Sequence, residues 1–147
     1  MAPAPRIRPI FIPPGGPPQG PRPPQAIFDQ IGKKGVFDLT TSLYRELGES
    51  DIREMFPPNL DAASRKSGAF FIQLMGGPPL YSETYGPPRM RQRHIPFEID
   101  QKARATWLAC FDRALDEAIR EDRFPESERA AFQAFLESFS TWMLNAE

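Results

Sequence analysis

The spacing of hydrophobic residues predicts helices along most of the chain after residue 25. Between residues 36 and 47 the apolar positions lie three or four residues apart, which is the spacing of an amphipathic helix. These positions are Val36, Leu39, Leu43 and Leu47. Gly32 and Gly35 flank two lysines just before them, and they predict a flexible break after a short helix at residues 27–31.

Proline-rich breaks separate the helical segments in the middle of the chain. SDIREMF, residues 50–56, predicts a short turn with Ser50 as its N-cap, and a pair of prolines stops it. A further helix is predicted over residues 61–75, with Asp61 at its N-terminus and GGPP at its end. PPLYSETYGPP follows and is expected to have little regular structure, whereas MRQRH is predicted to form a short helix closed by Pro96.

The last third of the chain predicts two long helices that pack together. Residues 99–121 place apolar side chains on one face: Trp107, Leu108, Phe111, Leu115, Ala118 and Ile119. Pro125 restarts a helix with a second broad apolar face: Phe132, Phe135, Leu136, Phe139, Trp142 and Met143. No alternating run competes with these helices. The fold class is therefore all-α, with one domain over residues 26–147.

The first 25 residues differ in composition from this domain. They contain 10 of the 18 prolines, which remove backbone donors and fix φ, so a flexible extension is expected. The extension also carries the apolar residues Ile7, Ile10, Phe11 and Ile12. These side chains leave two alternatives open, an arm that packs on the domain and a proline-motif ligand for a partner protein.

Charge and cysteine content narrow the class of protein. The formal net charge of −1 shows no excess of basic residues for nucleic acid. No segment approaches the roughly 20 apolar residues that cross a bilayer, and the N-terminus lacks a signal-peptide core. Cys110 is the single cysteine, which excludes an internal disulfide and fits a reducing compartment. A soluble cytoplasmic protein with neither membrane nor nucleic-acid partners is expected.

His94 is the only histidine, and this limits the chemistry of the chain. Catalysis by a triad is not expected, because Cys110 lies in a predicted helix among apolar residues, where a thiol stays protonated. Zinc needs three or four ligands. Haem iron, however, needs only one proximal histidine, and Arg89, Arg91 and Arg93 could meet the haem propionates. The alternatives are a surface or core histidine and an arginine cluster that complements a helix dipole.

Residues 56–115 carry an ordered set of motifs. FPPNLDAASRKSGAFFIQLMGGPPLYSETYGPPRMRQRHIPFEIDQKARATWLACFDRAL has an aromatic followed by prolines before a helix that ends in GGP. YSE and G-x-P-R-x-R-x-RH-x-PF follow, with a tryptophan 13 positions after the histidine. The run resembles the truncated, 2-on-2 haemoglobins of group II, or O type, and the similarity extends from about Ile27 to the final helix. The resemblance implies a globin sandwich of two helix pairs around one haem b.

The resemblance also implies a role for each matching residue. His94 is the proximal ligand of the iron, and Gly76 and Gly77 form the break that lets the loop wrap the cofactor. The implied haem contacts are Lys66 and Arg93 at the propionates, the apolar proximal contacts Met90 and Phe97, and Phe70 and Tyr81. The implied ligand pocket consists of the distal Tyr44, the wedging aromatic Phe56, Ala63 where larger globins keep a distal histidine, Ser67 one turn later, and Trp107.

These roles imply binding of oxygen, carbon monoxide and nitric oxide. Dioxygen bound to ferrous iron is partly negative, so the Tyr44 hydroxyl and the Trp107 indole can donate hydrogen bonds to it. Oxygen transport, storage or sensing, and nitric oxide dioxygenase or peroxidase chemistry served by a reductase, all fit such a pocket. Read from the residues alone, Tyr44, Phe70 and Trp107 can also be core aromatics. The alternative function is a globin-fold interaction or signalling module that does not rely on haem.

The chain departs from the family pattern at three places. The segments on either side of Phe56 are each one residue short, which affects the placing of this aromatic. Ser67 stands where the family usually has a bulkier apolar or amide side chain, so it offers a second hydrogen bond or room for water. The proline-rich extension lies outside the pattern altogether.

Overall fold

Six α-helices and two 3₁₀ turns make up the regular structure of this computed structural model, which describes residues 22–146. The helices are α1 Gln25–Gly48, α2 Leu60–Leu74, α3 Leu80–Tyr85, α4 Met90–His94, α5 Gln101–Arg120 and α6 Arg129–Met143. The 3₁₀ turns are η1 Arg53–Met55 and η2 Glu126–Glu128. The described residues contain no strand, so the all-α prediction is confirmed. Residues 1–21 of the predicted extension lie outside the described part, and α1 begins at the last residue that was assigned to that extension.

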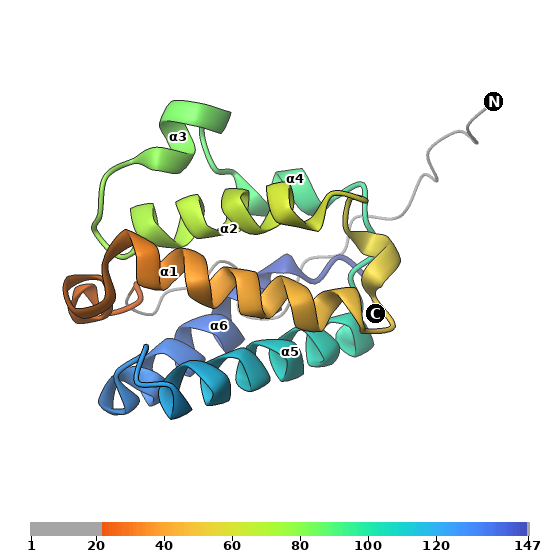
Figure 1. The fold of residues 1–147 in the computed structure, drawn as a ribbon. Coiled ribbons are helices and arrows are strands. Elements are labelled where there is room, and N and C mark those ends of the chain that lie inside the picture. The colour runs from red at the N-terminus through yellow and green to blue at the C-terminus, as the bar shows by residue number, and fades with distance from the viewer. Residues whose placement is uncertain (1–21, 147) are drawn as a thin grey trace.

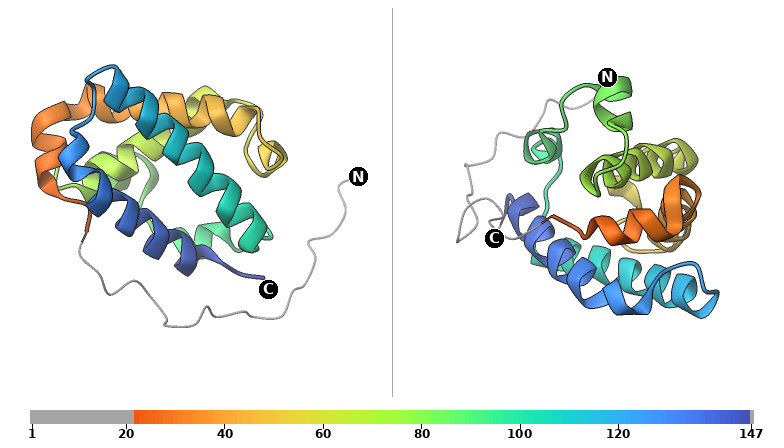
Figure 2. Two further views of the ribbon diagram at one scale, coloured as in Figure 1. Left: turned by 90° about the horizontal axis from the view of Figure 1, so that it is seen from below. Right: turned by 90° about the vertical axis from the view of Figure 1, so that its left-hand side faces the viewer.

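The long helices form two packed pairs, α1 with α2 and α5 with α6 (Figure 1). α1 packs against both α2 and α5, so it lies between them, and α6 runs beside α5. α3 covers one side of α2, and α4 contacts α6 (Figure 2). Ion pairs on the surface link α1 to α5: Glu46 binds Arg113 at 2.9 Å, and Arg45 binds Glu117. This arrangement of two packed helix pairs is the one that the resemblance implied.

Gly32 breaks α1 where the sequence predicted a break. Its φ of 66° and ψ of −174° interrupt the helical path, and a residue with a Cβ is strained at this positive φ. Ile27 is fully buried before the break, and Val36 is fully buried after it. The kink therefore lets both parts of one amphipathic segment bury their apolar residues.

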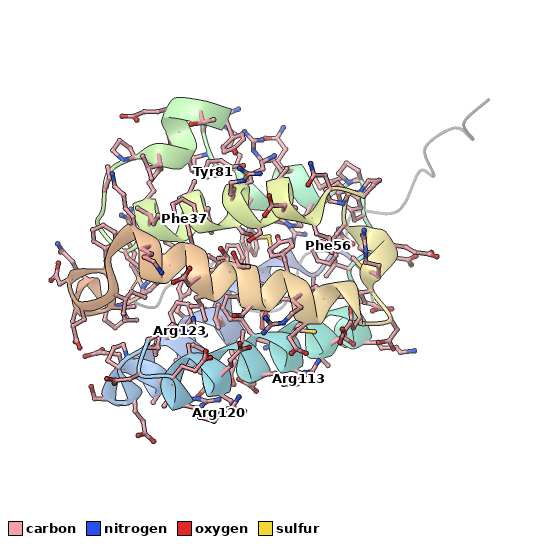
Figure 3. The ribbon with its side chains drawn as sticks, viewed as in Figure 1. Phe37, Phe56, Tyr81, Arg113, Arg120 and Arg123 are labelled. Carbon is pink, nitrogen blue, oxygen red and sulfur yellow. The ribbon has the colours of Figure 1, made fainter. Side chains whose placement is uncertain are left out.

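α2 lies close to α1 because small residues line their contact. A Cβ on Gly68 would come within 2.5 Å of the ring of Phe37, a side chain of α1 that Figure 3 labels. The start of α2 differs slightly from the prediction: the helix begins at Leu60, and the side chain of Asn59, rather than Asp61, accepts a hydrogen bond from the backbone of Ala62.

Ser50 lies between α1 and the turn that follows it, and its predicted role as the N-cap of that turn is confirmed only in part. Its hydroxyl donates to the carbonyl of Leu47 at 2.7 Å and thus closes the end of α1. It also accepts a 3.3 Å hydrogen bond from the backbone of Ile52, but η1 begins only after that residue and has no side-chain cap. Serine can satisfy the groups at the end of one helix as readily as those at the start of the next.

The segment PPLYSETYGPP was expected to have little regular structure, and this was wrong, because α3 occupies most of it. The amide of Gln73 on α2 holds the short helix by two hydrogen bonds: it donates to the hydroxyl of Ser82 at 2.8 Å and accepts from the backbone of Ser82 at 2.9 Å. Tyr81 is 1% exposed and anchors the same helix in the core. Tertiary contacts therefore stabilise a helix that is too short to form alone.

α5 and α6 supply the other half of the core. The side chain of Asp100 caps α5 by accepting from the backbone of Ala103 at 2.8 Å. Cys110 is fully buried on α5, and burial raises the pKa of its thiol, as expected for an unreactive cysteine. Among residues 22–146, none of the helices is both long enough and apolar enough to cross a lipid bilayer.

Candidate functional site

His94 is the last residue of α4, and its ring is fixed by the preceding turn. Nδ1 lies 2.6 Å from the carbonyl oxygen of Met90, so this nitrogen carries the proton and donates. Within residues 22–146, Nε2 has no hydrogen-bond partner and is the nitrogen left for a metal ion. Burial lowers the pKa of His94, and the charge of Lys66 lowers it further, while the Met90 hydrogen bond partly opposes both. The imidazole is therefore neutral at pH 7, as ligation requires.

The C-terminal segment of the chain holds the loop around His94. The Asn145 side chain donates to the carbonyl oxygens of His94 at 3.2 Å and Phe97 at 2.7 Å. Arg91 donates to the carbonyls of Trp142 and Leu144 and stacks 4.6 Å from the Trp142 ring. The sequence did not indicate a role for Asn145, because a residue type alone does not show which distant carbonyl groups its side chain will bind.

Tyr44 and Ser67 face each other across the contact of α1 and α2. Their hydroxyl oxygens lie 2.9 Å apart. The Tyr44 ring also packs edge-on against Phe56, with centroids 5.6 Å apart, which places the aromatic after η1 beside the tyrosine (Figure 3 labels Phe56). Burial raises the pKa of Tyr44, so the phenol keeps its proton and remains a donor. Ala63 is half-buried one turn before Ser67.

Trp107 of α5 belongs to an aromatic cluster that reaches α2. Its ring lies 5.1 Å from that of Phe111 and 6.4 Å from that of Phe139, and Phe139 lies 5.6 Å from Phe70. The Trp107 indole N–H has no hydrogen-bond partner within residues 22–146. The structure thus brings Trp107 and Phe70 together through Phe139, and it leaves the indole proton free to donate.

Cationic side chains gather beside two tyrosines at the edge of α2 and α3. Lys66 lies 5.2 Å from the ring centre of Tyr85, and the guanidinium of Arg93 lies 5.3 Å from that of Tyr81, which Figure 3 labels. Arg93 also donates to the carbonyls of Tyr85, Pro87 and Pro88. It therefore ties the loop before α4 to the site while its positive charge remains at this edge.

The hydroxyl of Tyr81 is buried without a hydrogen-bond partner in the described residues. An unsatisfied buried hydroxyl is costly and calls for a polar group from outside the protein. Tyr81 also contacts Phe70, with ring centroids 5.8 Å apart, so it lies between the aromatic cluster and Arg93. A buried donor beside a cation suits a carboxylate such as a haem propionate.

Met90 and Phe97, the two apolar proximal contacts that the resemblance implied, differ in burial. Met90 is half-buried and packs on the core, whereas 42% of Phe97 is exposed.

Two open hollows of about 350 and 210 Å³ lie elsewhere on the protein, the first beside Lys34 and Phe124 and the second beside Met55 and Lys102. Neither is lined by His94, Tyr44 or Trp107, so neither belongs to this site.

This donor set is compatible with a porphyrin. His94 has a free ring nitrogen, the half-buried Trp107 has an unused N–H, and Arg93 lies beside the unsatisfied hydroxyl of Tyr81. Tyr44 shares its hydroxyl with Ser67. These groups come from several helices, with His94 and Arg93 together on α4, so it is the packing of the helices that assembles them.

The comparisons with known proteins agree with the fold. The chain matches the family model of the bacterial-like globins over residues 26–145 and belongs to this family, whose members typically bind haem and diatomic ligands. It is 34% identical to group 2 truncated hemoglobin YjbI of Bacillus subtilis over 72% of this chain and 85% of that protein. It is also 34% identical to two-on-two hemoglobin-3 of Arabidopsis thaliana, over 66% of this chain and 58% of that protein's length.

Solved structures give the same result. Phosphate-bound Hell's gate globin IV superposes with a TM-score of 0.80 at 34% identity, covering 88% of this chain and 80% of that one. The group II truncated hemoglobin of Bacillus anthracis gives a TM-score of 0.75 at 30% identity, with 87% and 94% covered. The resemblance to group II truncated haemoglobins, drawn from the motifs of residues 56–115, is therefore confirmed.

Proposed function

We propose that this chain binds haem b through Nε2 of His94 and takes up oxygen and other diatomic ligands on the opposite side. The hydrogen bond from Nδ1 to the Met90 carbonyl is the observation that carries the proposal, because it fixes the tautomer in which Nε2 is unprotonated. The bound haem would supply an iron centre that coordinates small ligands. The residues of the chain would then decide how the cofactor and the ligand are held.

Tyr44 and Trp107 are the proposed donors to the ligand. Tyr44 is buried and its raised pKa keeps the phenol protonated, while the indole N–H of Trp107 is unused by residues 22–146. Oxygen gains more from such donors than carbon monoxide does, because its bound form carries more negative charge. Ala63 offers no imidazole to this side, so the pocket is open to ligand entry.

Lys66, Arg93 and Tyr81 are proposed to hold the propionates, and Phe70, Met90 and Phe97 to contact the apolar part of the macrocycle. Contacts between side chains support this division, because the first three lie at one edge and Phe70 lies beside Tyr81. Arg93 already donates to three carbonyls, so we expect it to attract a propionate by its fixed positive charge rather than by a bidentate hydrogen bond.

Absorption spectra of the purified protein, before and after haemin is added, test the proposal. The wild type is expected to show a Soret band and to change its spectrum with carbon monoxide after reduction. His94→Ala is expected to lose the proximal ligand, and added imidazole is expected to restore the ferrous carbonyl spectrum. A colourless wild type that stays apo with haemin would contradict the proposal and favour a haem-independent interaction or signalling module.

Reversible binding of oxygen, carbon monoxide or nitric oxide is the activity that this pocket supports best. Oxygen transport, a reductase partner and chemistry on nitric oxide or peroxide remain predictions, because they depend on electron supply and release rates. A cytoplasmic location also remains a prediction, based on the single cysteine.

A further inference from the structure

Two hydroxyl groups of the proposed ligand pocket lie within hydrogen-bond distance of each other. The Tyr44 oxygen on α1 lies 2.9 Å from the Ser67 oxygen on α2, and either can be the donor. Tyr44 is 9% exposed, and Phe56 packs edge-on against its ring. The phenol therefore has little freedom to move away from Ser67.

Each hydroxyl carries one proton, and this limits what the pair can do. If Tyr44 donates to Ser67, its proton is not available to a ligand. If Ser67 donates to Tyr44, the phenol oxygen accepts one bond and its own proton is free to point elsewhere. Consecutive hydrogen bonds also polarise one another, so a phenol that accepts from serine becomes a better donor.

We propose that Ser67 is a positioning residue for Tyr44: when a ligand occupies the pocket, the serine donates to the phenol oxygen and directs the tyrosine proton at the ligand. The inference rests on the proposed function and deepens it, because Ser67 then acts through Tyr44 and does not touch the ligand. An apolar side chain at position 67 cannot make this bond, so the effect depends on a side chain at this position that can donate a hydrogen bond.

A matched control lies one turn earlier on the same helix. Ser64 is 3% exposed, and its hydroxyl lies 3.5 Å from that of Thr40 rather than from Tyr44. Replacing either serine by alanine removes one hydroxyl from the same contact between α1 and α2. Only the change at Ser67 is expected to alter the binding of the ligand.

The oxygen dissociation rate and the C–O stretching frequency of the ferrous carbonyl form test the inference. Ser67→Ala is expected to speed oxygen dissociation by about two- to tenfold, the effect of one ordinary hydrogen bond. It is also expected to raise the C–O frequency, because a donor near the ligand lowers it. Ser67→Thr keeps the hydroxyl and is expected to restore both, whereas Ser64→Ala is expected to leave both at the wild-type values.

The same substitution in a Tyr44→Phe background separates the outcomes. Ser67→Ala is expected to have no further effect there, because the phenol through which it acts is gone. An equal acceleration in both backgrounds would mean that Ser67 contacts the ligand itself, and an unchanged rate in the wild-type background would mean that it positions nothing; either result overturns the inference while leaving the proposed function intact. A wild type that binds no haem would overturn both.

Discussion

Asn145 donates a hydrogen bond to the carbonyl oxygen of His94, 51 residues earlier in the chain, at a distance of 3.2 Å. The same amide donates to Phe97 and accepts from the backbone of Ile99 at 2.8 Å. One side chain after α6 therefore fixes the whole loop that follows α4. The orientation of the proposed iron ligand depends on this clamp as well as on its own helix.

Replacing Asn145 is expected to loosen the cofactor without removing its ligand. Asn145→Ala is expected to retain a Soret band but to release haem to a scavenger protein several-fold faster, because the carbonyls of His94 and Phe97 lose the amide that joins them to the end of α6, and the His94 carbonyl keeps only the backbone N–H of Phe97. Asn145→Asp keeps the acceptor for Ile99, but it replaces the two donors by a carboxylate oxygen that faces the carbonyls of His94 and Phe97. If the donors matter, the aspartate variant should release haem at least as fast as the alanine variant. Release at the wild-type rate from both variants would contradict a role for Asn145 in holding the loop.

Each of the two proposed distal donors is expected to slow the dissociation of oxygen. Tyr44→Phe and Trp107→Phe should each speed oxygen dissociation by at least about twofold, since each removes one hydrogen bond of roughly 0.5 to 3 kcal/mol. Carbon monoxide dissociation should change less. If stopped-flow measurements give unchanged oxygen dissociation rates for both variants, the proposal that Tyr44 and Trp107 donate to the ligand is wrong.

The spacing of apolar residues predicted every long helix, because the buried face of a helix repeats in the sequence itself. The break at Gly32 was also predictable, since glycine tolerates the positive φ found there. The short helix that ends at His94 was predicted from the sequence MRQRH and from Pro96 after it. These features are local, so the sequence near each of them was sufficient.

Features that depend on distant partners could not be predicted in this way. α3 forms because Gln73 binds Ser82 and because Tyr81 is buried, and neither fact is visible in the segment itself. Arg93 was interpreted only as a propionate partner, yet it also binds three carbonyls of its own loop. Polar side chains have many candidate partners, and tertiary packing chooses among them.

The stability of the apo-protein is expected to fall as the pH drops below about 6.5, with His94 contributing. Burial holds the pKa of His94 below its ordinary value of 6.5, so the unfolded chain takes up a proton at a higher pH than the folded chain does. In this window the unfolded state binds more protons, and the free energy of unfolding therefore decreases as the pH falls. Once the pH lies below the pKa of His94 in the folded protein, this residue no longer contributes to the decrease in the free energy of unfolding.

Urea denaturation of the apo-protein over this pH range measures the effect. His94→Gln removes the titrating group, so its stability should depend less on pH between about 7.5 and 5.5 than that of the wild type. Parallel curves for the two proteins would show that the buried imidazole does not contribute.

Tyr81→Phe separates a structural role from a cofactor role. The Tyr81 hydroxyl has no partner in the described residues, so its removal should leave the apo-protein as stable as before, or more stable by up to about 1 to 3 kcal/mol. If the hydroxyl binds a propionate, the holo-protein should lose haem faster. Thermal melting and haem transfer are the two measurements, and unchanged haem transfer would remove Tyr81 from the proposed site.

Gly77 is expected to tolerate no side chain, because its neighbours include backbone. A Cβ at this position would lie 2.9 Å from the carbonyl oxygen of Ile72 and 2.9 Å from the ring of Phe28. Its N–H already donates to the same carbonyl at 2.9 Å, so the loop cannot shift without losing this bond. Gly77→Ala should therefore lower the free energy of unfolding by about 1 to 3 kcal/mol, the usual cost of overpacking.

Gly48→Ala is the matched control for Gly77→Ala. Its added Cβ would meet only the end of the Leu60 side chain, at 2.9 Å, and this flexible group can turn aside. Alanine also has a higher helix propensity than glycine, and Gly48 is the last residue of α1. Urea denaturation should therefore show little change or a gain for this variant. An equal loss in both variants would mean that neither steric clash nor backbone contact distinguishes the two glycines, and the tight turn after α2 would then not explain why glycine stands there.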